Sequence, residues 1–127
     1  MFGFRSTKDI ITLFHKAGSP TSTKVVNLLK QASIAAAESS SKREFELDIT
    51  ERDPTADQVS TILGYVGDKG ASSVIENAAT ASDALKKFKE NVSYFQKPLV
   101  VDWHNGKVVA GENESEILKL IEALPKN

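Results

Sequence analysis

The chain has 127 residues, a length typical of one domain with a single hydrophobic core, and we expect residues 1–127 to form one domain. Its 16 Lys and Arg face 17 Asp and Glu, and this balance argues against a dedicated nucleic-acid-binding protein, which normally carries a basic face. The longest uncharged stretch, residues 58–67, is far shorter than the roughly 18 apolar residues that span a bilayer. No cysteine is present, so the chain's own residues supply no disulfide, thiolate nucleophile or cysteine metal ligand.

The first eight residues carry Arg5 and Lys8 and no acid. They lack the apolar core of about 7–15 residues that a secretory signal requires. They have the charge pattern of a mitochondrial presequence, but they are too short for a convincing amphipathic helix. We expect residues 1–8 to be a short tail.

The N-terminal third of the chain predicts a strand, a helix and a second strand. Residues 9–15 are β-branched and aromatic, as in a strand buried on both faces. After a turn, Ser19 is a good N-cap, and a helix is expected from residue 21 to about residue 37. A polar loop at residues 38–43 then precedes a half-exposed strand at residues 44–49. The buried stripe of the helix is expected to consist of Val25, Leu28, Leu29 and Ala32.

Two helix starts follow. Thr55 and Gln58 form a capping box, and Gly67 is the expected end of that helix, with a further short helix at residues 70–79. Thr80 and Asp83 give the next capping signal. The predicted inward residues of the first of these helices are Val59, Ile62, Leu63 and Val66, and those of the last are Leu85, Phe88 and Val92.

The C-terminal third predicts a hairpin and a helix. A strand at residues 97–102 is followed by Asn105-Gly106, the strongest short hairpin signal, and by a returning strand at residues 108–110. Asn113 with Glu116 opens a final helix, and Pro125 follows its end. The fold class is therefore α/β, with one mixed four-stranded sheet and helices on both faces. This is the thioredoxin-like topology, and the alternative is a ferredoxin-like α+β sandwich.

The start of the first helix is the candidate binding site. Helix N-termini present unpaired N–H groups and a partial positive charge, so they can hold an anion or stabilise a thiolate. The N–H groups of residues 21–24 are the expected donors, and a carboxylate, a phosphate or a glutathione-like peptide is a reasonable ligand. The alternative is that these hydroxyls only cap the helix. The residues concerned are His15, Ser19, Thr21, Ser22, Thr23 and Lys24.

Three segments resemble the arsenate-reductase branch of the thioredoxin-like superfamily. They read L-F-H-K-A-G-S-P-T-S-T-K, D-P-T-A-D-Q-V-S-T-I-L-G-Y-V-G and K-P-L-V-V-D-W-H-N-G-K-V-V-A-G-E. The chain as a whole, from about residue 9 to residue 124, is most similar to a small fungal family of candidate mitochondrial redox proteins. The resemblance implies a thioredoxin-like fold, a mitochondrial location and an oxidoreductase ancestry.

The resemblance also assigns positions. It places the reactive cysteine of arsenate reductases at Ser19, and the cysteine of the fungal family, where one occurs, near Val25. It matches Lys97-Pro98 to the cis-proline that faces the active loop, where arsenate reductases have an arginine before the proline. A serine cannot replace the thiolate of thiol–disulfide exchange, because the serine hydroxyl stays protonated at pH 7. A bound thiol such as glutathione would then have to supply the sulfur.

Two functional hypotheses follow. In the first, the chain is a redox protein that acts only with an external thiol. In the second, it is a non-catalytic module that binds a small thiol, a peptide or an anion. A structural or assembly role is a third possibility, and a metal site made by His15 and His104 with Asp102 or Glu112 is a weak alternative. We expect no resident cofactor other than glutathione.

Overall fold

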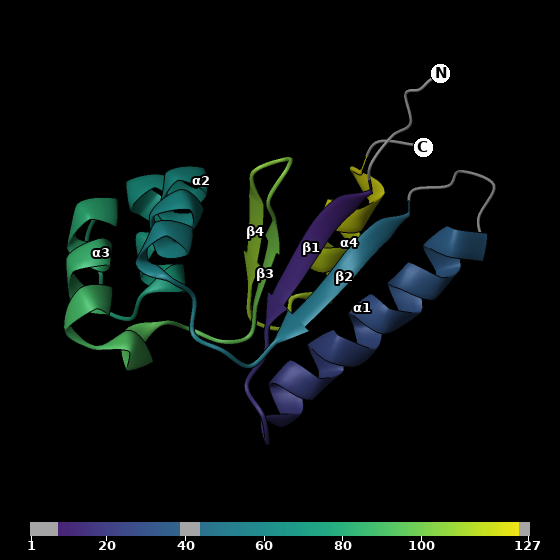
Figure 1. Ribbon diagram of the computed structural model, residues 1–127, viewed down its shortest axis with the longest axis horizontal. Helices are drawn as coiled ribbons and strands as arrows, with labels where there is room; N and C mark the ends of the chain where they lie inside the picture. Colours follow the sequence, from purple (N-terminus) through teal and green to yellow (C-terminus); the bar gives the residue numbers. More distant parts are fainter. Residues whose placement is uncertain (1–7, 39–43, 125–127) are drawn as a thin grey trace.

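The computed structural model describes residues 8–38 and 44–124 (Figure 1). The predicted tail, except for Lys8, therefore lies outside the described residues, as do Pro125 and residues 39–43 of the predicted polar loop. In chain order the elements are β1 (Asp9–Phe14), α1 (Pro20–Glu38), β2 (Phe45–Thr50), α2 (Ala56–Val74), α3 (Ala81–Glu90), the 3-10 helix η1 (Val92–Tyr94), β3 (Leu99–Asp102), β4 (Lys107–Ala110) and α4 (Glu114–Glu122).

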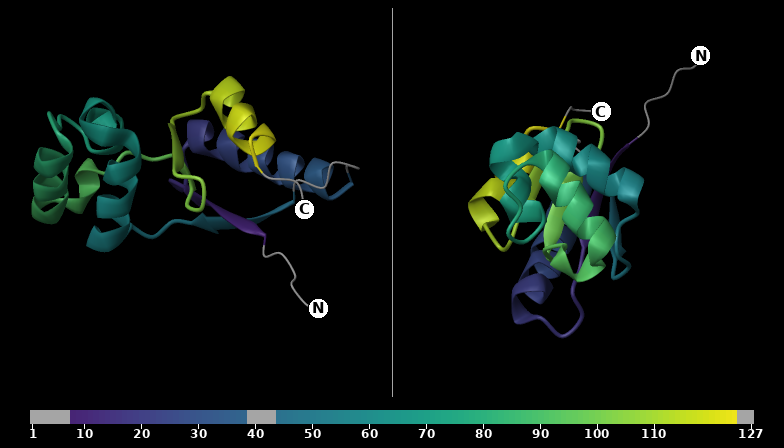
Figure 2. Two further views of the ribbon diagram at one scale, coloured as in Figure 1. Left: turned by 90° about the horizontal axis from the view of Figure 1, so that it is seen from above. Right: turned by 90° about the vertical axis from the view of Figure 1, so that its left-hand side faces the viewer.

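The strands form one mixed sheet in the order β2-β1-β3-β4. Strand β1 pairs parallel with β2 and antiparallel with β3, and β3 and β4 form the predicted hairpin. Helices α1 and α4 cover one face, and α2 and α3 lie on the other side of the sheet (Figure 2, left). The predicted mixed sheet with helices on both faces is confirmed, and its strand order excludes the ferredoxin-like alternative.

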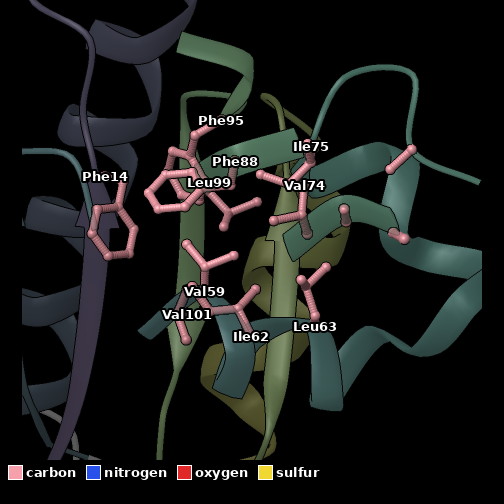
Figure 3. Packing of buried hydrophobic residues seen from close by; sticks show 13 residues of the cluster. Phe14, Val59, Ile62, Leu63, Val74, Ile75, Phe88, Phe95, Leu99 and Val101 are labelled. Atoms are coloured by element: carbon pink, nitrogen blue, oxygen red, sulfur yellow. The ribbon is translucent and has the colours of Figure 1, made fainter. Parts of the chain in front are cut away.

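The core has two halves because alternate residues of β1 point to opposite faces of the sheet. Ile11 and Leu13 pack with α1 and α4, whereas Phe14 packs with α2 and α3. In the second group, the Phe14 ring meets the Phe95 ring edge to face, with centroids 5.2 Å apart (Figure 3). Each fully buried aliphatic or aromatic side chain of this kind contributes about 1.5–3 kcal/mol to folding.

Helix α2 begins where its capping box predicts. The Thr55 side chain accepts the Gln58 N–H at 3.1 Å, and the Gln58 side chain accepts the Thr55 N–H at 2.9 Å. The first helical segment ends at Gly67, as the sequence suggested. Gly67 has φ 71 and kinks the element, which then continues to Val74. Ala71 and Val74 are buried, so core packing resumes the helix after a glycine that breaks it.

The predicted short helix at residues 70–79 was therefore wrong in its bounds. Its first half is the second segment of α2, and Ile75 instead forms an isolated bridge with Phe95. The stripe predicted for α3 was also wrong at Val92. The helix ends at Glu90, and Val92 lies in η1 with 46% of its surface exposed. Ala84 and Phe88 are the buried residues of α3.

The C-terminal third follows its turn signals closely. Gly106 has φ 66, which suits the hairpin turn, and Asn113 caps α4 by accepting the Glu116 N–H at 3.2 Å. Strand β3 begins at Leu99 rather than at residue 97. Within the described part of the chain, no helix is both long enough and apolar enough to cross a membrane.

Candidate functional site

The candidate site lies where β1 ends and α1 begins. Phe14 pairs with Leu99, so the chain leaves β1 at His15 at the same end of the sheet at which it enters β3 from Pro98. The Lys97-Pro98 peptide bond is cis, as the resemblance implied. The loop that leads to Ser19 and the lysine–proline step therefore lie at the same end of the sheet. This is the end at which α1 begins, at the bottom of Figure 1.

Ser19 acts as the N-cap of α1. Its hydroxyl accepts the Ser22 N–H at 3.2 Å, and its carbonyl accepts both the N–H and the hydroxyl of Thr23 at 2.9 Å. Pro20 has no N–H, and within residues 8–38 and 44–124 the Thr21 N–H is the donor of the first turn that has no internal partner. Fewer donors are thus free than the sequence suggested, since Ser19 itself occupies two of them.

Ser22 is fully buried and links α1 to the end of β1. Its Oγ accepts the backbone N–H of Lys16 at 3.0 Å and is hydrogen-bonded to Nδ1 of His15. The hydroxyl can donate as well as accept, so this bond forms with the proton on either ring nitrogen. The bond fixes one side of the half-buried imidazole through Nδ1.

The two lysines of the predicted site are engaged in different ways. The Nζ of Lys97 donates to the Glu51 carbonyl at 3.0 Å and pairs with Asp53 at 3.2 Å, and only 15% of its side chain is exposed. Lys97 therefore ties the loop after β2 to the start of β3. The Lys24 ammonium lies 3.9 Å from the Glu112 carboxylate in an exposed pair, which contributes little to stability.

The main chain of Lys97 also contributes polar groups to this end of the sheet. Gln96 donates its N–H to the Val74 carbonyl, and the Pro98 carbonyl accepts the Gly111 N–H. Between them, the N–H and C=O of Lys97 have no hydrogen-bond partner among the described residues. Both groups lie next to the cis bond, so an extended peptide could pair with them there.

The structure separates the two positions that the resemblance gave for a cysteine. Ser19 is half-buried at the helix N-terminus, within reach of solvent. Val25 is 1% exposed and packs in the core shared by α1 and α4. A thiol at position 19 would meet solvent and the helix dipole, whereas a thiol at position 25 would be enclosed by apolar groups.

The two histidines do not share a site. His15 follows the last residue of β1, while His104 follows β3, whose last residue Asp102 pairs with Ile11 near the start of β1. The imidazoles therefore lie at opposite ends of the sheet. Among the described residues, no group of three or more His, Asp or Glu side chains is arranged to hold a metal ion.

A second polar cluster, at the hairpin end, was not predicted. The Asn105 amide donates to Asp102 at 2.8 Å and to Asp9 at 3.0 Å, and Asp102 is fully buried. Trp103 donates its Nε1–H to Thr12 at 2.7 Å, and its ring packs edge to face on Phe14. The bonds from Asn105 to Asp9 and from Trp103 to Thr12 join residues far apart in the chain, and no local sequence signal could have revealed them.

Comparison with known proteins agrees with this geometry. The family described as "Protein of unknown function (DUF1687)" matches residues 3–111. The Schizosaccharomyces pombe protein named "Putative redox protein fmp46, mitochondrial" is 33% identical over 109 residues, which is 85% of this chain and 87% of that protein. The arsenate reductase of Vibrio cholerae superposes with a TM-score of 0.63 at 11% identity, covering 89% of this chain and 98% of that structure.

The arsenate reductase shows the fold alone, because so few residues are identical. It confirms the thioredoxin-like topology that the order of strands and helices predicted. The fungal relative is a mitochondrial protein, and the similarity to it extends over most of both chains. On the span of the family match and the identity to this relative, the chain belongs to the DUF1687 family.

Proposed function

We propose that this protein is a mitochondrial member of the thioredoxin-like superfamily that binds a thiol-bearing peptide such as glutathione and does not itself exchange disulfides. The observation that carries the proposal concerns the N–H and C=O groups of Lys97, which have no hydrogen-bond partner among the described residues. They lie at the same end of the sheet as the Ser19 loop. Peptides commonly bind by adding their backbone to unpaired N–H and C=O groups of this kind. The mitochondrial location rests on the fungal relative.

The polar groups at this end of the sheet are suited to bind a thiol. Position 19 has a hydroxyl where the resemblance places a cysteine, so the sulfur at this position would have to come from the ligand. The free Thr21 N–H and the partial positive charge of the helix N-terminus favour a thiolate or a carboxylate there. The Nε2 atom of His15 is a further polar group at the same end of the sheet.

A second candidate is an oxidoreductase in which bound glutathione supplies the reacting sulfur. The name of the fungal relative favours this possibility. In that reaction, the glutathione thiolate would attack a substrate disulfide, form a mixed disulfide and release one substrate thiolate. A second glutathione would then release the other thiolate as the oxidised glutathione dimer forms. The protein would only position the glutathione, since the chain has no sulfur nucleophile of its own.

The binding proposal is tested by titrating the ¹⁵N-labelled protein with reduced glutathione and, separately, with S-methylglutathione. We expect amide shifts at Thr21 and Lys97 with both ligands, and larger shifts with the free thiol. Two variants at one position sharpen the test. Ser19→Asn keeps a good N-cap without charge, whereas Ser19→Asp keeps the cap and adds a carboxylate that repels an anionic ligand.

The expected result is binding to the wild type and to Ser19→Asn, with clearly weaker binding to Ser19→Asp. Shifts elsewhere in the molecule, or equal affinity for the two variants, would contradict the proposed site. A disulfide-reduction assay with glutathione then separates the two candidates. Turnover above the rate of glutathione alone that is lost in Ser19→Asp favours the oxidoreductase, and binding without turnover favours the non-catalytic module.

A further inference from the structure

The face of β1 and β2 that points away from α1 is only partly covered. Ile10, Thr12 and Phe14 point to this side from β1, and Glu46 and Asp48 point to it from β2. Helix α2 packs against β4, at the other edge of the sheet. In the left view of Figure 2, no described helix lies over this side of β1 and β2. Ile10 is 43% exposed and both acids are exposed, whereas Thr12 and Phe14 are buried.

Two surface hollows extend along this face. One, of about 500 Å³, is lined by Lys8, Ile10, Trp103 and their neighbours at the start of β1. The other, of about 450 Å³, is lined by Thr12, Phe14, Asp48 and the start of α2. Between them, Thr12 joins Trp103 to Asp48 by hydrogen bonds of 2.7 and 3.2 Å. The face is therefore a shallow groove that runs parallel to β1. Trp103, held by its hydrogen bond to Thr12, forms part of its wall.

We infer that this groove binds a basic amphipathic helix of a partner protein. Parallel strand pairs are normally covered by helices on both faces, and on this face the α2–α3 side packs only against the Phe14 end of β1. The exposed part, formed by Ile10, Glu46 and Asp48, extends over two strands, about 10 Å, which matches the diameter of one helix. Strand β1 has six residues and is about 20 Å long, the length of a helix of about 14 residues.

The charges around the groove indicate which sign of charge the partner carries. Along the β2 edge, Glu46 and Asp48 have no described cation beside them. At one end Lys8 is paired with Glu44 at 3.6 Å, Asp9 accepts from Asn105, and His104 lines the same hollow. At the other end Asp53 is paired with Lys97, and Arg52 is exposed. Carboxylates outnumber the cations on this face, so lysines and arginines flanking an apolar stripe would complement it.

The same acids argue against a second copy joining through the β2 edges. In an antiparallel pair of β2 strands centred on Leu47, Glu46 of one copy would lie opposite Asp48 of the other, and like charges directly opposite are destabilising. This site differs from the glutathione site, because it is centred on the outer face of β1 and reaches Lys97 only through the side chain of Asp53 at its far end. The two proposals can therefore fail independently.

Trp103 is the only tryptophan of the chain and reports directly on the groove. The probe is a synthetic peptide of about 14 residues without aromatic side chains, with leucines at helical spacing and lysines elsewhere. We expect it to shift the Trp103 emission to shorter wavelength, with an affinity that falls as salt is raised. A scrambled peptide of the same composition and a peptide with glutamates in place of the lysines should leave the emission unchanged.

Charge reversal locates the site. The double change Glu46→Lys with Asp48→Lys should weaken binding of the lysine peptide by at least about tenfold, while the remote reversal Glu122→Lys on α4 should leave it unchanged. Ile10→Ser offers a second, milder variant that should also weaken binding, because Ile10 is already largely exposed and its loss should not disturb folding.

Three results would overturn the inference. The first is an absent shift, or an equal shift with the scrambled peptide. The second is an affinity that the reversals at positions 46 and 48 do not change. The third is a shift of the emission with protein concentration alone, or only after removal of residues 1–7, because a second copy or the chain's own N-terminal segment would then occupy the groove.

Discussion

The buried hydroxyl of Ser22 in α1 is hydrogen-bonded to Nδ1 of His15, the residue that follows β1. The same oxygen accepts the Lys16 N–H at 3.0 Å, so one side chain holds both ends of the loop that carries Ser19. The loop conformation therefore depends on a residue that does not face the proposed ligand.

Replacing Ser22 with alanine should lower the free energy of unfolding by about 1–3 kcal/mol, because the Lys16 N–H and the His15 ring then lose a buried partner. Urea denaturation measures the change. Ser60→Ala, at an exposed position of α2, is the matched control and should change the free energy by no more than about 0.5 kcal/mol. Equal effects of the two substitutions would show that the Ser22 contacts do not stabilise the loop.

A cysteine introduced in place of Ser19 should be reactive, and one in place of Val25 should not. The helix N-terminus stabilises a thiolate at position 19, so we expect its pKa to lie below the ordinary value of about 8.5. Val25 is enclosed by the core, where a thiol is shielded from reagents. Because the chain has no other cysteine, the alkylation rate of Ser19→Cys and Val25→Cys as a function of pH measures each thiol alone.

The opposite ranking, or a thiol at position 19 with an ordinary pKa, would mean that the loop around Ser19 lacks the electrostatic character expected of it. The comparison also tests the ancestry of the site. A reactive thiol at position 19 would mean that the surroundings of the lost cysteine persist in a chain that no longer has one.

Sequence reasoning identified those elements that begin or end with a local chemical signal. The Thr55–Gln58 capping box and the Asn105-Gly106 turn each specify a backbone geometry through residues that are neighbours in the chain, and both appear where predicted. Gly67 was correctly identified as a break in the helix. A helical segment after it was also predicted, but its end at Val74 was not, because the chain there turns to the bridge between Ile75 and Phe95, which are distant in sequence.

The candidate site was predictable in position and much less so in detail. The helix start at Ser19 and the position of Pro98 could be named from the sequence. The pairing of Phe14 with Leu99 brings both to the same end of the sheet. The links from Ser22 to His15 and from Lys97 to Asp53 were not foreseen. Nothing local distinguishes a buried serine in the first turn of a helix from an exposed one, and the lysine–aspartate pair joins segments whose proximity only the fold creates.

Replacing Phe14 with alanine should lower the free energy of unfolding by about 3–5 kcal/mol, since its ring is buried between Phe95 and Trp103. The exposed Val92→Ala is the control, with an expected change of at most about 0.5 kcal/mol. Trp103 emission follows both unfolding transitions. A small effect at Phe14 would mean that the core between the sheet and the α2–α3 pair is loosely packed.

Two glycines should respond to alanine in opposite directions. Gly106 has φ 66, and a Cβ there would lie 3.2 Å from the Tyr65 ring, so Gly106→Ala should lower the free energy of unfolding by more than about 1 kcal/mol. Gly64 lies within α2 with open space around it, and Gly64→Ala should raise that free energy by about 0.5–1 kcal/mol. Urea denaturation of both variants tests the pair, and a stabilising Gly106→Ala would contradict the hairpin geometry and its contact with Tyr65.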